Sequence, residues 1–171
     1  YTRMFTEVGR RTLPHSTAVG KAMLIEHDAA DVRALLARTG MPRLTEHTLT
    51  TPEEFLAAVD EARERGYATD EGEQELGVRC VAVPVPGARR PLALSMSGPT
   101  SRVDDAAAER AADVLRAAAE KIAAELDADT GPDGRIDTAT AEHTVLRRLG
   151  DPAQLARRYS GVRQYLVGPD V

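Results

Sequence analysis

Two runs of alternating large and small side chains stand out between Gly66 and Pro99. In residues 78–85 valines alternate with cysteine and alanine, and in residues 91–97 leucine and methionine alternate with alanine and serine. Because successive side chains of a strand point to opposite faces, each run predicts a strand with one bulky apolar face and one face of small groups. A purely structural sheet usually exposes long polar side chains on its outer face. The small faces therefore favour a cavity for a small molecule.

Helical spacing and capping residues predict four helices around these strands. The first begins near His15 or Ser16, the second runs from Asp28 to Gly40, the third from Thr51 to Gly66, and the fourth spans residues 104–126. The third has the clearest start, since an N-cap threonine precedes a proline and two glutamates. The apolar stripe of the fourth is predicted to consist of Ala111, Val114, Leu115, Ala118, Ile122 and Leu126.

Further strands are predicted at residues 4–8 and 67–70. The connection between the strands at 78–85 and 91–97 is too short for a parallel crossover, so that pair is predicted to be antiparallel. Hairpin-linked strands mixed with helices indicate an α+β domain over residues 1–126. Residues 127–139 are polar, contain Gly and Pro, and read as a linker. Residues 140–171 are predicted to form a short helical tail, which is too small to be stable alone.

Composition narrows the classes of function. The 171 residues carry a net charge of −5 and only 4% aromatic side chains, which argues against a nucleic-acid surface or an anionic-membrane surface on this chain. No apolar run approaches membrane-spanning length. A single cysteine excludes an internal disulfide and fits a reducing cytoplasm. The chain opens at Tyr1 without Met, so we expect it to be a fragment or a processed form.

Cys80 has two interpretations. It is a small pocket-lining or core side chain, as free cysteines usually are, or it is a nucleophile with His15 as its base. No paired Cys/His spacing supports a zinc site, and we expect neither a metal nor a cofactor.

Other polar residues of these segments are candidates for binding. Asp70, at the end of a predicted strand, is either a solvated or turn carboxylate or an acceptor for a ligand hydroxyl or amine. Ser95 and Ser97 project from the same side of one strand and either bond across the sheet or donate to a ligand oxygen. Residues 15–21, HSTAVGK, start a helix whose free N–H groups favour an anion, although no phosphate-loop pattern is present.

Four segments together resemble the effector-binding domain of the IclR family of bacterial transcriptional regulators. They are VGRRTLPHSTAVGKAML, LTEHTLTTPEEF, ARERGYATDEGEQELGVRCVAVPV and LALSMSGPTSRV. The most specific motifs are G-Y-A-x-D, G-V-R-C-V-A-x-P-V and S-x-S-G-P, found in this order. The resemblance covers residues 1–126, about three quarters of the chain.

The resemblance implies a GAF-like domain whose curved antiparallel sheet is flanked by helices, with a metabolite, often a carboxylate, on the concave face. Transferred by position, the ligand-binding residues are Ala18, Val19, Asp70, Cys80, Ser95 and Ser97. Relatives can carry glycine at the position of Ala18, so the extra methyl narrows the pocket.

The resemblance also implies a cytoplasmic homodimer or tetramer that is not an enzyme. DNA is contacted only through a winged helix-turn-helix domain, which is absent from this chain together with the first strands of the sensor domain. Two alternatives remain. One is a small enzyme that uses Cys80 as a nucleophile with His15. The other is an interaction module in which the small-residue faces of the strands belong to the core and bind no ligand.

Overall fold

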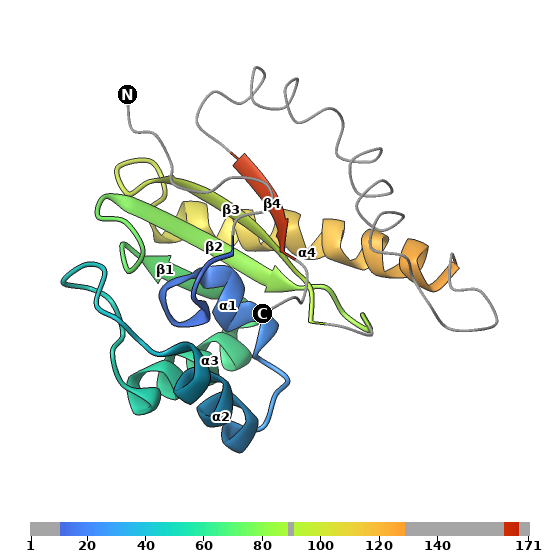
Figure 1. Ribbon diagram of the computed structural model, residues 1–171. Helices are drawn as coiled ribbons and strands as arrows, with labels where there is room; N and C mark the ends of the chain where they lie inside the picture. The colour runs from blue at the N-terminus through green and yellow to red at the C-terminus, as the bar shows by residue number, and fades with distance from the viewer. Residues whose placement is uncertain (1–10, 89–90, 129–162, 168–171) are drawn as a thin grey trace.

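The computed structural model describes residues 11–88, 91–128 and 163–167 (Figure 1). Its elements follow the order η1 (Pro14–Ser16), α1 (Ala18–Met23), α2 (Ala29–Thr39), α3 (Pro52–Arg65), β1 (Ala68–Glu71), β2 (Val78–Pro84), β3 (Ala93–Pro99), α4 (Asp105–Ala128) and β4 (Arg163–Val167). The strands form one sheet in the order β1-β2-β3-β4, and each neighbouring pair is antiparallel. The α+β class and the antiparallel β2–β3 pair predicted from the sequence are confirmed.

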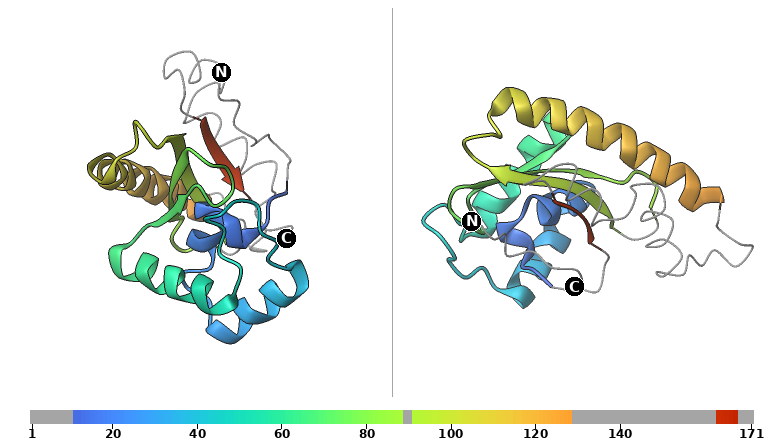
Figure 2. Two further views of the ribbon diagram at one scale, coloured as in Figure 1. Left: turned by 90° about the vertical axis from the view of Figure 1, so that its left-hand side faces the viewer. Right: turned by 90° about the horizontal axis from the view of Figure 1, so that it is seen from above.

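The two faces of the sheet are covered by different helices (Figure 2). Val81, Val83 and Leu94 lie on the face that packs against α4. The buried stripe of α4 consists of Ala108, Ala112, Leu115, Ala119, Ile122 and Leu126. On the opposite face, the small side chains of the strands pack against α1. The alternation seen in the sequence therefore sorts bulky residues to α4 and small residues to α1.

Helix α3 lies beside α1 and joins it to α2. Phe55 and Val59 of α3 are buried against Val32 and Leu36 of α2. Helix α3 starts as its sequence predicts: Thr51 Oγ1 accepts from the backbone N–H of Glu54, and the Glu54 carboxylate accepts from the backbone N–H of Thr51. This capping box fixes where α3 begins after the preceding loop.

Three details differ from the sequence-based expectations. Val114 is 67% exposed and does not belong to the buried stripe of α4, because the spacing 108, 112, 115, 119 turns residue 114 away from the sheet. Helix α1 starts at Ala18 with Thr17 as its N-cap, after a separate turn of 3-10 helix at Pro14–Ser16. Asp28 occupies the N-cap position of α2, but its side chain makes no capping hydrogen bond.

Parts of the prediction lie outside the described residues. These are the strand at 4–8, almost all of the linker, and residues 140–162 of the predicted helical tail. Of the tail, the structure describes Arg163–Val167, which form a strand paired with β3 rather than a helix. Within the described ranges, no helix has the length and apolar character needed to cross a membrane.

Candidate functional site

Three of the predicted side chains form a single row across the sheet. Asp70 of β1 pairs with Cys80 of β2, and Cys80 pairs with Ser97 of β3. Ser95 lies in the adjacent row, opposite Ala82. Because paired residues of antiparallel strands share a face, all four side chains belong to the face covered by α1. The register thus confirms that Cys80, Ser95 and Ser97 share the small-residue face predicted from the sequence.

The remaining two predicted residues lie in α1, over this face. Ala18 is buried in the cluster formed with the alanines of β1, β2 and β3, and Val19 and Cys80 pack against the same cluster. Thr17 Oγ1 accepts from the N–H of Gly20. The structure therefore brings the predicted residues together between α1 and the sheet.

Asp70 is buried, and its side chain stabilises the turn that follows β1. Its Oδ1 accepts a hydrogen bond from the backbone N–H of Glu73 at 2.7 Å. Burial, followed by the nearby negative charge of Glu73, raises the pKa of Asp70 from 3.8 to about 6. This carboxyl group therefore changes its protonation state close to neutral pH, which few aspartates do.

Cys80 lies between Asp70 and Ser97 as a neutral thiol. Ser97 Oγ donates to Cys80 Sγ at 3.1 Å, and a hydrogen bond links the thiol to the Asp70 carboxyl group. Burial first, and then the charge of Asp70, raises the pKa of Cys80 to about 12. A thiol with this pKa is a poor nucleophile, since the thiolate is the reactive form.

The proposed base of the enzyme alternative lies elsewhere. His15 is fully buried in η1, and its Nε2 is 3.0 Å from the carbonyl oxygen of Pro42. In the described part of the chain, no histidine is hydrogen-bonded to Cys80. The geometry thus gives no support to a Cys80–His15 pair. Nor do the described residues contain a group of three or more His, Cys, Asp or Glu side chains placed to hold a metal ion.

Two buried charged residues next to the site were missed by the sequence analysis. Lys21 of α1 is 3% exposed and Glu73 is 6% exposed, and the two form an ion pair. A local signal existed for Lys21, since it lies three residues after Ala18 and four before Ile25, on the apolar side of the helix. Glu73 carried no comparable signal, because it belongs to an acidic run that is typical of a solvated loop.

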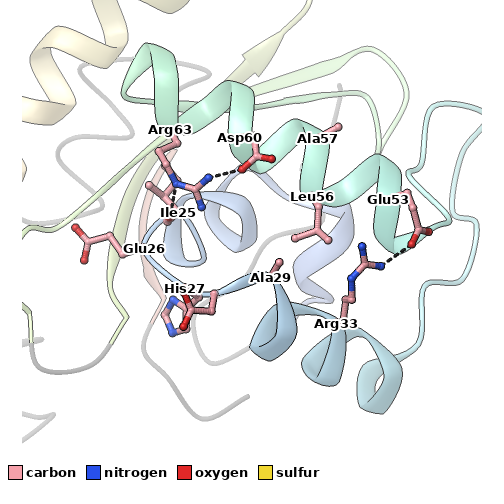
Figure 3. Close-up of a pocket in the computed structure, with 11 residues that line it drawn as sticks. Ile25, Glu26, His27, Ala29, Arg33, Glu53, Leu56, Ala57, Asp60 and Arg63 are labelled. Atoms are coloured by element: carbon pink, nitrogen blue, oxygen red, sulfur yellow. Dashed lines mark hydrogen bonds and ion pairs between the residues drawn. The ribbon is translucent and has the colours of Figure 1, made fainter.

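A groove of about 730 Å³ opens on another part of the surface (Figure 3). It lies between α2, α3 and the loop that follows α1, and none of the six predicted residues lines it. Arg33 of α2 forms an ion pair with Glu53 of α3 across it, and Arg63 bonds to Asp60 and to the carbonyl oxygen of Ile25. Its cationic side chains are therefore already engaged by groups of the protein itself.

Comparison with known proteins identifies the family to which this chain belongs. The family described as "Bacterial transcriptional regulator IclR C-terminal" matches residues 1–124. The chain belongs to the IclR family of bacterial transcriptional regulators, over the C-terminal domain of that family.

Individual relatives agree with this assignment. The HTH-type transcriptional regulator KdgR of Escherichia coli is 39% identical over 126 residues, which is 72% of this chain and 48% of KdgR. The crystal structure of the C-terminal domain of E. coli KdgR has a TM-score of 0.64 and covers 68% of this chain and 73% of that domain. The chain thus spans about half the length of the curated relatives it matches.

One solved relative contains a ligand. It is a double mutant of the inducer-binding domain of the transcription factor PobR from Acinetobacter, in complex with 3-hydroxybenzoic acid. It is 31% identical to this chain, has a TM-score of 0.61, and the match covers 68% of this chain and 69% of that one. These relatives are regulators of transcription and not enzymes by name.

Proposed function

We propose that this chain is the effector-sensing domain of an IclR-type regulator and that it binds a small carboxylate between α1 and the sheet. The observation that carries the proposal is the row Asp70–Cys80–Ser97, which puts small polar groups on a buried sheet face where apolar packing alone would suffice. The naming of KdgR as a helix-turn-helix regulator, and the hydroxybenzoate bound to the PobR domain, support the same interpretation.

Each predicted residue has a binding role that follows from its chemistry. Ser95 and Ser97 donate hydroxyl hydrogens to the carboxylate of the effector, helped by the first N–H groups of α1 at Ala18 and Val19. Asp70 faces a hydroxyl or amine at the other end of the effector. Cys80 lines the floor as a neutral thiol. To bind the effector, Ser97 redirects the hydrogen that it now donates to Cys80 Sγ.

The effector then acts on DNA binding through assembly. We propose that the cytoplasmic protein is a homodimer or tetramer, and that effector favours one arrangement of the sensor domains over another. This changes the spacing of winged helix-turn-helix domains that lie outside this chain. Such a shift requires the effector to bind the two arrangements unequally. The chain's own net charge of −5 fits a role that leaves DNA contact to another domain.

A thermal-shift screen of small carboxylates, including 2-oxo acids, 2-hydroxy acids and 3-hydroxybenzoate, tests the proposal. A sensor shows a melting temperature that rises with the concentration of at least one compound. Ser95→Ala and Ser97→Ala should weaken that compound's affinity roughly tenfold each, whereas Ser101→Ala, an exposed serine outside the site, should not. Unchanged affinity in both site variants would overturn the assignment of the pocket. A screen without any stabilising compound would favour the interaction module.

A further inference from the structure

The ion pair between Lys21 and Glu73 is buried beside the candidate site. Lys21 Nζ lies 2.5 Å from Glu73 Oε1, and it also donates to the backbone carbonyl oxygen of Thr69 at 2.8 Å. Removing two charges from water is costly and often outweighs their attraction. A buried ion pair is therefore weak evidence that it stabilises the fold. The groups that Lys21 and Glu73 hold in position indicate another role for this pair.

The pair is joined to Asp70 from both sides. Thr69, whose carbonyl group accepts from Lys21, directly precedes Asp70 in β1. Glu73, whose carboxylate accepts from Lys21, donates its own backbone N–H to Asp70 Oδ1. Lys21 lies one turn after Ala18 in α1, so the same side chain also ties the start of α1 to the Asp70 end of the sheet.

The charges of this cluster do not balance. Asp70 and Glu73 supply two carboxylates, whereas Lys21 supplies one ammonium group. Glu73 Oε2 is buried, and in the described part of the structure it has no hydrogen-bond partner. The titratable groups around Asp70 are Lys21 from α1, Glu73 from the turn and Cys80 from β2, while β3 contributes the uncharged Ser97. Glu73 disfavours the ionised form of Asp70 and Lys21 favours it.

We propose that Lys21 and Glu73 are positioning residues of the effector site, which hold Asp70 in place and set whether its carboxyl group carries a proton. The proposal rests on the proposed function in that Asp70 is taken to face the effector. A protonated Asp70 offers the effector a hydrogen-bond donor, and an ionised Asp70 offers only acceptors. By setting the protonation state of Asp70, Lys21 and Glu73 therefore determine whether Asp70 binds an acceptor group or a donor group of the effector.

The test is an NMR titration of Asp70 in the effector-free chain, with ¹³C-labelled aspartate carboxyl groups and Asp70→Asn to assign the signal. The wild-type signal should titrate with a midpoint near pH 6. Glu73→Gln removes a like charge and should lower the midpoint by roughly one pH unit, whereas Lys21→Met should raise it by about as much. Simple loosening of the fold would instead expose Asp70 and lower the midpoint in both variants.

Controls separate position from charge. Glu71→Gln removes an equal charge beside Asp70 in the sequence, from an exposed side chain that pairs with Arg79, and should leave the midpoint unchanged. Lys21→Arg keeps the positive charge and should keep the wild-type midpoint to within about half a pH unit. Should Lys21→Met fail to fold, Glu73→Gln still decides when its free energy of unfolding is measured alongside. An unchanged or raised midpoint overturns the proposal, as does a lowered midpoint that comes with a loss of stability; a lowered midpoint at wild-type stability supports it. Because no effector is used, this result is independent of the outcome of the carboxylate screen.

Discussion

Ser97 Oγ donates a hydrogen bond to Cys80 Sγ across the β2–β3 ladder, at 3.1 Å. The thiol in turn is linked to the carboxyl group of Asp70 on β1. This row connects three strands through polar side chains on a face that is otherwise lined by alanine. A thiol buried in this row, with its pKa raised by burial and by the charge of Asp70, is poorly suited to act as a nucleophile.

The first prediction concerns the reactivity of Cys80. Because burial and the charge of Asp70 raise the pKa of the thiol to about 12, iodoacetamide at pH 8 should alkylate the folded chain at least ~100-fold more slowly than the urea-unfolded chain. Asp70→Asn removes the second of these causes and should speed the reaction of the folded chain. A folded thiol that reacts as fast as a free model thiol would contradict this, and would restore the enzyme alternative.

The second prediction concerns stability and pH. The pKa of Asp70 is about 6 in the folded chain against 3.8 for an ordinary aspartate, so the folded state binds the proton more tightly than the unfolded state. The contribution of Asp70 to stability is therefore greatest at low pH and falls as pH rises from about 4 through 6. The expected loss between pH 4.5 and pH 8 is about 2 kcal/mol.

Urea unfolding of wild type and Asp70→Asn across this range measures the effect. The asparagine side chain does not titrate. The free energy of unfolding of the variant should therefore rise relative to that of the wild type by that amount as the pH rises. Asp31→Asn, at an exposed position of α2, should keep a constant difference from the wild type. The opposite slope would mean that Asp70 is stabilised as an anion.

The third prediction concerns the start of α3. Thr51→Ala removes the side-chain oxygen that accepts from the backbone N–H of Glu54, and should lower the free energy of unfolding by about 1 kcal/mol. Thr50→Ala changes the neighbouring residue, whose hydroxyl group lies outside the capping box, and should alter it by less than about 0.5 kcal/mol. Equal effects of the two substitutions would show that the capping box contributes nothing beyond loss of a threonine.

These features differ in how far the sequence predicts them. The capping box is local: Thr51 and Glu54 are three residues apart, and both residue types are typical of a helix start. The two-residue alternation in β2 and β3 is also local, and it assigned Cys80 and Ser97 to the small-residue face correctly. The stripe of α4 was predicted less well, because an alanine-rich helix offers several alternative faces and Val114 was placed on the wrong one.

The charged cluster is not a local feature. Lys21 and Glu73 are separated by 52 positions, and buried lysines are rare enough that a solvated position is the natural expectation. Only the tertiary structure brings α1 against the turn after β1. The exact row of Asp70, Cys80 and Ser97 likewise depends on the register of two hairpins, and the residues of their turns do not determine that register alone. The function was inferred from the family resemblance, because serine and cysteine side chains on a strand do not by themselves indicate a sensor.

The last prediction concerns the contact between α1 and η1. A Cβ atom at Gly20 would lie 2.2 Å from the carbonyl oxygen and 2.5 Å from the Cα atom of Pro14. Both are backbone atoms, so Gly20→Ala should force η1 away from α1 and lower the free energy of unfolding by at least about 2 kcal/mol. Gly98→Ala is the matched control, because its Cβ would meet a side-chain methyl group of Val103, at 2.9 Å, which moves more easily.

The outcome is informative because helix propensity predicts the reverse sign. Within a helix, alanine is favoured over glycine by about 1 kcal/mol, so a substitution governed by propensity alone would stabilise the chain. Urea unfolding of both variants decides between the two effects. A Gly20→Ala variant as stable as the wild type would mean that η1 is not held against α1. The start of α1, with Ala18 and Val19, would then lack the rigid support that a preorganised effector site needs.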